Sequence, residues 1–250
     1  MTRRRWIANT WTTTTASLTG DQAVHLARVL RAEPGQIFDV VANGFLHRAE
    51  ITSVTESQVL FTLHEELDSA AALPLHLLLA VFKFDHMEWA IEKSTELGIA
   101  RITPILARRS EKHLTLASSK RVERWRRIAL EASKQSRRTD VPEVSDPLQL
   151  NPALDKEESP IRILLSETEQ NITLVAALEN VQMAPRQVGL SDVNTATTHA
   201  IAIGPEGGWT PEEMALFASH QWQSVTLGRR ILRAETAAIA AIAIASTRLT

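Results

Sequence analysis

The spacing of apolar residues predicts a strand-rich first part of the chain. In "QIFDVVANGFLHRAEITSV", two β-rich runs flank Asn43-Gly44, and "QVLFTLHEE" supplies a third run. An Asn-Gly pair between such runs predicts a type I′ hairpin, because both central residues must adopt positive φ. The preceding "DQAVHLARVLRAEPG" predicts a short helix that Asp21 could cap and a Pro-Gly turn closes. A unit of about 70 residues built this way fits a small β-barrel.

The spacing of apolar residues changes at Leu75, where the continuous apolar run "LHLLLAVF" predicts a strand buried on both faces. The next segment, "DHMEWAIEKSTELG", predicts a helix with Asp85 and Glu88 as a capping pair and Gly98 as its C-terminal cap. Further strands are predicted in "IARITPIL", "IRILLSE", "HAIAIG" and "SVTLG". Further helices are predicted at about Ser119–Arg138, in "QNITLVAALEN", from Pro211 and over "ETAAIAAIAIAST".

Strands that alternate with helices predict an α/β domain with a mostly parallel sheet. The segments 139–160 and 183–199 are expected to be long surface loops, and "LDSAAALP" to be a linker. We therefore expect two domains, residues 1–72 and 73–250.

Composition excludes several classes of protein. The chain of 250 residues has no cysteine, which rules out disulfides and thiolate metal ligands and fits a cytoplasmic protein. Its eight histidines form no metal-binding pair of known spacing, so we expect no metal site. No apolar run is long enough for a membrane span, and the basic N-terminus lacks the apolar core of a secretory signal.

Charge is distributed unevenly along the chain. The formal net charge is −2, but residues 83–138 carry +7 and residues 139–250 carry −7. Solvated helix faces would account for such segments, and so would a surface that binds a polyanion.

Three glycines in the stretch "AIGPEGGWTPEE" (202–213) stand where a parallel strand is predicted to end and a helix to begin. That edge of an α/β sheet is where ligands bind, and glycines let a ligand approach the backbone. Thr210, Pro211 and Glu213 have the pattern of a helix start with a capping box. The spacing matches neither a phosphate loop nor a dinucleotide turn, so a tight turn and a loop for a ligand that is not strongly anionic both remain open.

A second bend follows in "VTLGRRILRAETAAIAAIAI". The last helix is Ala/Ile on nearly every side, which predicts that it is buried all round, in its own fold or in a dimer interface. Arg233 and Glu235 stand beside this apolar helix, where a charge is costly unless it is paired.

The two bends together resemble the RsmE-type methyltransferases, which modify N3 of a uridine in 16S ribosomal RNA and belong to the SPOUT class. The resemblance rests on "IAIGPEGGWTPEE" and "TLGRRILRAETAA", and "EKSTELGIARITPILARRSE", "RWRRIALEASKQSRRTDVPEV" and "HLARVLRAEPGQIFDV" agree in order and spacing. It covers nearly the whole chain. It implies an N-terminal PUA-like β-barrel that binds RNA, an α/β domain with a C-terminal trefoil knot, and a homodimer acting on 16S rRNA, within the 30S subunit.

The resemblance also implies S-adenosylmethionine as cofactor, bound at the knot. The cofactor-binding residues carried over are Glu167, Ile203, Gly204, Gly207, Gly208, Leu227, Gly228, Ile231, Leu232 and Thr236. The catalytic candidates are Arg233, to stabilise charge on the uracil, Glu206, to orient Arg233 or move a proton, and Arg138, at the place of the arginine in the family's Q-S-G-R. Here Arg137 replaces that glycine, and Ala234 stands where the family has Thr in ILRTETA.

The expected RNA-binding residues are basic or aromatic. Phosphate contacts are expected from Lys83, Arg108, Arg109, Arg124, Arg127 and Lys134, and on the barrel side from Arg5, together with Arg3 and Arg4, and from Arg31. Trp6 is the aromatic residue expected to touch RNA, whereas Trp89 and Trp125 are expected in a core or an interface.

Two other functions remain open on the sequence. One is another SPOUT methyltransferase, acting on a ribose 2′-hydroxyl or on tRNA. The other is a non-catalytic RNA-binding or assembly protein on the same scaffold.

Overall fold

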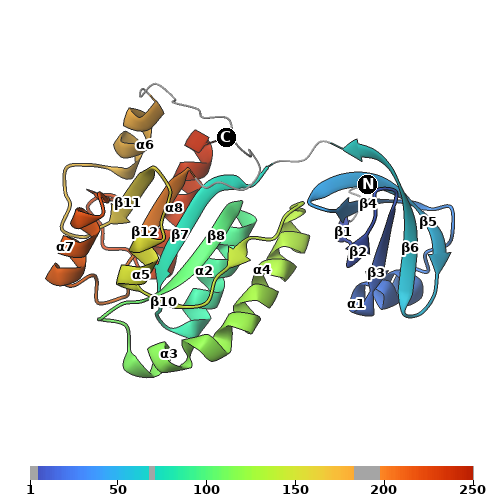
Figure 1. Cartoon of the computed structure of the whole chain (residues 1–250), viewed down its shortest axis with the longest axis horizontal. Helices are drawn as coiled ribbons and strands as arrows, with labels where there is room; N and C mark the ends of the chain where they lie inside the picture. Colours follow the sequence, from blue (N-terminus) through green and yellow to red (C-terminus); the bar gives the residue numbers. More distant parts are fainter. Residues whose placement is uncertain (1–4, 68–70, 183–197, 250) are drawn as a thin grey trace. The chain divides into compact units, whose positions relative to one another are not determined.

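The computed structural model describes residues 5–67, 71–182 and 198–249. By its internal contacts the chain divides into two units (Figure 1). Unit 1 comprises residues 1–71 with 133–140, and unit 2 comprises residues 72–132 with 141–250. The boundary predicted at residues 72 and 73 stays a prediction. In the part of the chain that is described, no helix has the length and apolar character needed to cross a bilayer.

Unit 1 is built on a six-stranded sheet. Its strands are β1 (Arg5–Ile7), β2 (Thr10–Trp11), β3 (Thr15–Thr19), β4 (Ile37–Ala42), β5 (Phe45–Val54) and β6 (Gln58–Leu67), in the order β1-β4-β5-β6-β3-β2. The β4–β5 hairpin is confirmed: Asn43 and Gly44 have φ of 53° and 79°, as a type I′ turn requires. Leu18, Val40 and Phe61 lie in the core of this unit.

The predicted helix of unit 1 forms with a different geometry. Helix α1 (Gly20–Val24) continues into a π-helical turn η1 (His25–Val29). Asp21 does not cap it: the N-cap is Thr19, whose side chain makes no capping hydrogen bond. The strands β1, β2 and β3 were not predicted. The first two are only three and two residues long, and β3 lies in a threonine-rich segment without sustained apolar alternation.

Unit 2 has a parallel sheet of seven strands (Figure 1). They are β7 (Leu73–Ala80), β8 (Ile99–Leu106), β9 (Glu143–Val144), β10 (Leu148–Gln149), β11 (Ile161–Leu165), β12 (His199–Ile203) and β13 (Gln223–Val225). The order is β10-β8-β7-β12-β11-β13, and β9 also pairs with β8. The predicted fold class, an α/β domain with a mostly parallel sheet after a strand-rich domain, is confirmed.

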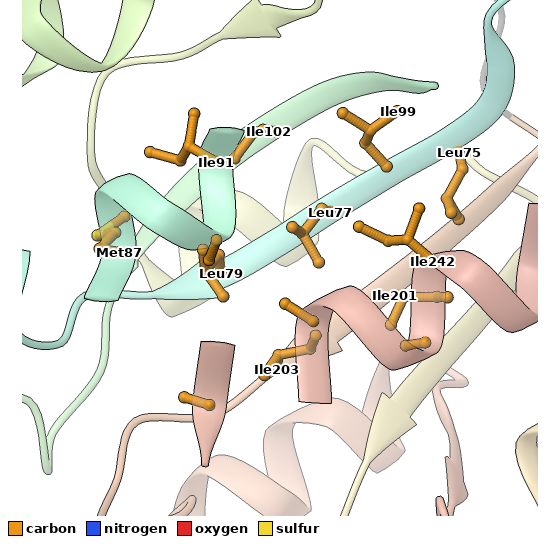
Figure 2. Close-up of a cluster of buried hydrophobic side chains, with 14 of the residues drawn as sticks. Leu75, Leu77, Leu79, Met87, Ile91, Ile99, Ile102, Ile201, Ile203 and Ile242 are labelled. Carbon is orange, nitrogen blue, oxygen red and sulfur yellow. The ribbon is translucent and has the colours of Figure 1, made fainter. Parts of the chain in front are cut away.

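The helices of unit 2 are α2 (Phe84–Glu96), α3 (Lys112–Ala117), η2 (Ser118–Arg121), α4 (Val122–Ser136), α5 (Leu150–Asp155), α6 (Leu174–Gln182), α7 (Pro211–Ser219) and α8 (Ala234–Leu249). Residues of α2, α4, α6 and α8 pack on one sheet face, against side chains such as Leu77 and Ile201. Residues of α5 and α7 pack on the other face, against side chains such as Leu78 and Ala202. Figure 2 shows the first cluster, in which Met87 and Ile91 of α2 and Ile242 of α8 pack on the same face of the sheet as Leu77 of β7.

Three predictions about elements of unit 2 are wrong. Segment 139–160 is not a loop, because it forms β9, β10 and α5. Asp85 and Glu88 do not cap α2: the N-cap is Lys83, and Glu88 accepts hydrogen bonds from Arg124 instead. The expected linker is shorter at its end, since β7 already begins at Leu73. Most of the loop predicted at 183–199 lies outside the described residues.

Candidate functional site

The carboxyl ends of β12, β11 and β13 lie side by side, and each is followed by a loop. We call these the β12 loop (204–210), the β11 loop (166–173) and the β13 loop (226–233). The pairs Leu164↔Ala202 and Leu165↔Val225 bring Ser166 into register with Gly204 on one side and Thr226 on the other. Neighbouring strands are about 4.8 Å apart, so the two glycine-bearing bends leave the sheet about 10 Å apart.

The β12 loop depends on its glycines for close packing. A Cβ on Gly204 would stand 3.1 Å from the indole nitrogen of Trp209, which is buried against the sheet face below. Gly208 has φ of 69°, a conformation that favours glycine, and its N–H donates to the Pro205 carbonyl at 2.8 Å. The loop is therefore a compact turn with buried Trp209 beneath its first residue.

The predicted capping box of α7 is confirmed. The Thr210 side chain accepts from the Glu213 N–H, the Glu213 carboxylate accepts from the Thr210 N–H, and Pro211 begins the helix. The other oxygen of this buried carboxylate accepts from the N–H of Arg108 at 2.8 Å. Glu213 thus joins the start of α7 to the segment that leaves β8.

Arg109 fixes the β12 loop from the β8 side. Its guanidinium donates to the carbonyl of Gly207 at 2.8 Å and to that of Trp209 at 3.3 Å. Its aliphatic stem lies against Gly207, where an added Cβ would stand 3.3 Å from the Cβ of Arg109.

The β13 loop turns on Thr226 and Gly228. Gly228 has φ of 115°, and the Thr226 hydroxyl bonds to both its N–H and its carbonyl at 3.1 Å. The rest of the loop is open: Arg233 is exposed, and Ile231 is 80% exposed. The Arg233 carbonyl accepts from the N–H of Ala237 and so begins α8.

The β11 loop lies between the other two. Its end returns to the β13 loop, where the Thr226 N–H donates to Ile172 and the Leu174 N–H donates to Thr226. The Glu169 carboxylate accepts from the N–H groups of Asn171 and Ile172, which lowers the pKa of Glu169. Glu167 is exposed at the start of this loop.

The sheet edge thus brings together many of the predicted site residues. The three loops that carry the cofactor-binding candidates follow adjacent strands. Two further candidates flank them: Ile203 is buried at the end of β12, and Thr236 is exposed in the first turn of α8. Arg233 and Glu206 lie in two of these loops and are both exposed. Within the described residues, no ion pair joins Arg233 to Glu206.

A buried carboxylate follows the β13 loop. Glu235, in the first turn of α8, is 2% exposed, and one of its oxygens lies 3.5 Å from Nδ1 of His86 in α2. The charged group nearest to this carboxylate is therefore a histidine, and the contact lies where the first turns of α2 and α8 meet.

The cations predicted to bind RNA fall into two groups in unit 2. Lys83 follows β7, and Arg108 and Arg109 follow β8, so all three lie at the carboxyl edge of the sheet. Arg108 lies 3.6 Å from Glu212.

Arg124 and Arg127 belong to the second group, on α4, where they line an open groove with Glu123, Arg126 and Leu130. The Arg124 guanidinium makes two hydrogen bonds to Glu88, at 2.5 and 2.7 Å, and this carboxylate raises the pKa of Arg124.

The remaining candidates belong to unit 1, and Trp6 is a correction. Its ring is 5% exposed and lies 5.8 Å from the ring of His25, so in this structure it is a core residue and offers no face to RNA. Arg5 donates to the carbonyl of Arg137, whereas Arg31 is exposed with a positive φ of 50°. Arg3 and Arg4 lie outside the described residues.

Arg138, a catalytic candidate, is also grouped with unit 1. It is 9% exposed, and its guanidinium is paired with Asp140. Lys134, in the last turn of α4, is partly buried. The tryptophans of unit 2 differ: Trp125 is fully buried, as expected of a core residue, and Trp89 is 51% exposed.

Sequence reasoning missed the residues that support the loops. Trp209 and Thr226 bind no predicted ligand, but each fixes the turn at a glycine of the motif. A threonine two positions before Gly228 was a local signal for such a turn. Arg109 was predicted as a phosphate contact, and no local signal indicated that it supports the β12 loop, because its partners there lie about a hundred residues away.

Comparisons with known proteins identify the family. A model described as "RNA methyltransferase domain" matches residues 69–246, and one described as "RNA methyltransferase PUA domain" matches residues 18–63. Ribosomal RNA small subunit methyltransferase E of Synechocystis is 35% identical over 92% of this chain and 72% of its own length. That of Bacillus subtilis is 31% identical over 91% of this chain and 88% of its own.

Solved structures agree with the sequence comparisons. The crystal structure of ribosomal RNA small subunit methyltransferase E from Neisseria gonorrhoeae, bound to S-adenosyl methionine, is 28% identical with a TM-score of 0.76. It covers 98% of this chain and 97% of its own. A methyltransferase from Legionella pneumophila, also in complex with this cofactor, is 27% identical with the same TM-score, over 99% and 98% of the two chains. The chain therefore belongs to the family of the ribosomal RNA small subunit methyltransferases E, among the RNA methyltransferases.

Proposed function

We propose that this protein transfers a methyl group from S-adenosylmethionine to N3 of a uridine in the 16S RNA of the small ribosomal subunit. The observation that carries the proposal is the convergence of the three loops at one sheet edge, with both family motifs in the outer two. The relatives from Synechocystis, Bacillus subtilis and Neisseria gonorrhoeae are ribosomal RNA methyltransferases, and two solved relatives hold S-adenosylmethionine.

The residues present fit this cofactor. Among the described residues, no heavy atom lies within 4 Å of the place a Cβ on Gly228 would take, so a ligand could approach the backbone of the β13 loop. Glu206 and Glu167 are exposed carboxylates on the two neighbouring loops, and they suit a ligand that carries a positive sulfonium. The cofactor supplies, when bound, an electrophilic methyl group.

The protein's own residues would then hold the uracil and stabilise the charge that develops on it. The Arg233 guanidinium, exposed at the end of the β13 loop, is suited to donate to a uracil carbonyl that gains negative charge. Glu206 would orient that guanidinium or accept the N3 proton. Precise placement of the two reactants would supply much of the remaining rate.

The RNA would be held by cations at the sheet edge and on α4, and by the PUA domain. Lys83 and Arg108 lie beside the proposed reaction site, and Arg127 is exposed in the groove on α4. Phosphate contacts of this kind position a substrate without reading its sequence. Arg109 and Arg124 have protein partners and would contribute less.

The same proposal includes a homodimer. The residues Ala238, Ala241, Ile242 and Ala245 of α8 are fully buried, whereas Ile239, Ala240, Ala243 and Ile244 are only partly covered. Trp89 adds a half-exposed aromatic surface on α2, the helix that packs on α8. A second copy of the chain would cover this apolar surface.

Nucleoside mass spectrometry tests the activity. Small subunits from a strain that lacks the gene should gain one N3-methyluridine in 16S RNA when treated with the purified protein and S-adenosylmethionine. Naked 16S RNA, treated in parallel, shows whether the assembled subunit is the substrate. A ribose-methylated nucleoside, or no methylated product on either substrate, would contradict the proposal.

A further inference from the structure

We infer that Arg109 is a positioning residue that holds the β12 loop in its cofactor-binding shape, and not a phosphate contact. The inference rests on the proposed function and concerns the same site. Strand order places β7 between β8 and β12, so the segment that leaves β8 must cross the end of β7 to reach the β12 loop. We call residues 107–110 the strap.

The strap is anchored on both sides of Arg109. The Arg108 N–H donates to buried Glu213 at 2.8 Å, which ties the strap to the start of α7. The Ser110 hydroxyl donates to the carbonyl of Val81 at 2.5 Å, which ties it to the end of β7. The backbone of Arg109 is therefore fixed before its side chain reaches the loop.

The guanidinium then bridges the two peptide groups on either side of the positive-φ glycine of the loop. Its targets, the carbonyls of Gly207 and Trp209, belong to the residues on either side of Gly208, whose φ is 69°. Hydrogen bonds from a charged donor are stronger than neutral ones, so the two bonds select this one loop conformation. With Arg109 on the strap side, the face of the loop toward β11 and β13 is left for the cofactor.

Replacement of Arg109 by Met retains an unbranched stem against Gly207 and removes the donors. We expect the dissociation constant for S-adenosylmethionine, measured by calorimetry on the full-length protein, to rise about tenfold, or about 1.4 kcal/mol. R109K, which can donate to one carbonyl, should recover part of that loss. K112M removes an exposed cation at the start of α3, just beyond the strap, and should leave cofactor affinity unchanged.

Steady-state kinetics separates positioning from substrate contact. R109M should raise the KM for the cofactor about tenfold and leave kcat at saturating cofactor within about twofold. Unchanged cofactor affinity in R109M, or a loss confined to RNA affinity, would overturn the inference and favour a phosphate contact. If R109M does not fold, wild-type cofactor affinity in R109K would overturn it equally.

Hydrogen exchange tests the inference even if the proposed function fails. In the protein without cofactor, R109M should speed exchange of the amides of the β12 loop at least several-fold, and leave the β13 loop unchanged. Equal exchange in both proteins would show that Arg109 does not order the loop. A wild-type protein that orders its loop but binds no S-adenosylmethionine would instead contradict the proposed function.

Discussion

At the scale of single residues, the shape of the candidate site depends on backbone positions that require glycine. Gly204 is needed because Trp209 fills the space a Cβ would take, and Gly228 is needed because its φ is 115°. The exposed charges, Arg233 and Glu206, stand on loops whose shape these contacts fix. The proposed chemistry would therefore depend on a few residues that touch substrate and on others that shape the backbone.

Replacement of Arg233 by Ala should abolish methylation while the cofactor still binds. Loss of a donor to the developing charge is expected to lower kcat by a hundredfold or more. The dissociation constant for S-adenosylmethionine should stay within about threefold of wild type. Methyl transfer from a tritium-labelled donor and calorimetry measure the two quantities.

R233K provides the graded comparison for that experiment. It keeps the positive charge without the planar fork of donors, so it should retain turnover between those of R233A and the wild type. Near-normal kcat in R233A would remove Arg233 from the proposed mechanism. A large loss of cofactor affinity in R233A would make Arg233 a binding residue instead.

At the scale of elements, the last helix shows where local pattern and packing differ. The Ala/Ile composition of α8 predicted burial on all sides, but the single chain buries one face fully and the other only in part. The sequence alone could not separate a helix enclosed by its own domain from one shared between subunits. Sheet packing decided which face is covered inside the chain.

The partly covered face of α8 should be the place where two copies meet. A charged side chain in place of Ile239 would be buried in the interface without a partner. The free-energy cost of burying this charge should be enough to separate the two subunits. I239D should therefore change the mass in solution from that of a dimer to that of one 27.7 kDa chain, measured by light scattering after gel filtration.

Thr247→Asp is the control for that change. Thr247 is exposed near the end of the same helix, so T247D should keep the mass of the wild type. A wild-type protein that is monomeric at micromolar concentration would contradict the proposed dimer directly.

At the scale of the whole molecule, two buried titratable groups far apart in sequence make unit 2 sensitive to acid. Burial of Glu157 raises its pKa, but hydrogen bonds from His76 and Ser159 prevail and lower it to about 2. Burial lowers the pKa of His199 to about 4. Both groups therefore bind a proton more readily in the unfolded chain.

These two pKa values determine how the stability of the fold changes with pH. As pH falls, stability from His199 is lost between its ordinary pKa of 6.5 and about 4, and stability from Glu157 between 4.5 and about 2. His220 acts in the opposite direction, because its hydrogen bond with Asp155 raises its pKa. His220 is less deeply buried than His199 and Glu157. We therefore expect the stability lost from those two groups at low pH to exceed the stability gained from His220.

The midpoint of thermal unfolding should accordingly fall by roughly 5 °C between pH 7 and pH 5. His199→Gln removes one of the groups that titrate in this interval, so the midpoint of H199Q should depend less on pH there. Equal slopes in both proteins would show that His199 does not carry the effect.

Local sequence determined much of this architecture. The Asn43-Gly44 hairpin, the capping box at Thr210 and Glu213, and the long apolar strands of unit 2 all form as predicted, because each depends on residues adjacent in the chain. The motifs at the two bends also sufficed to name the family. Their position after predicted parallel strands placed the candidate site at the carboxyl edge of the sheet.

Only the tertiary structure decided which side chains are free to act. Trp6 is buried in a core, Arg109 and Arg124 are bound to partners far away in sequence, and Glu235 lies beside His86. Strand order placed the β11 loop between the two glycine-bearing bends, which no local pattern indicated. The physical reason is that burial and pairing depend on contacts between distant segments, whereas turns, caps and periodicity depend on neighbours in the chain.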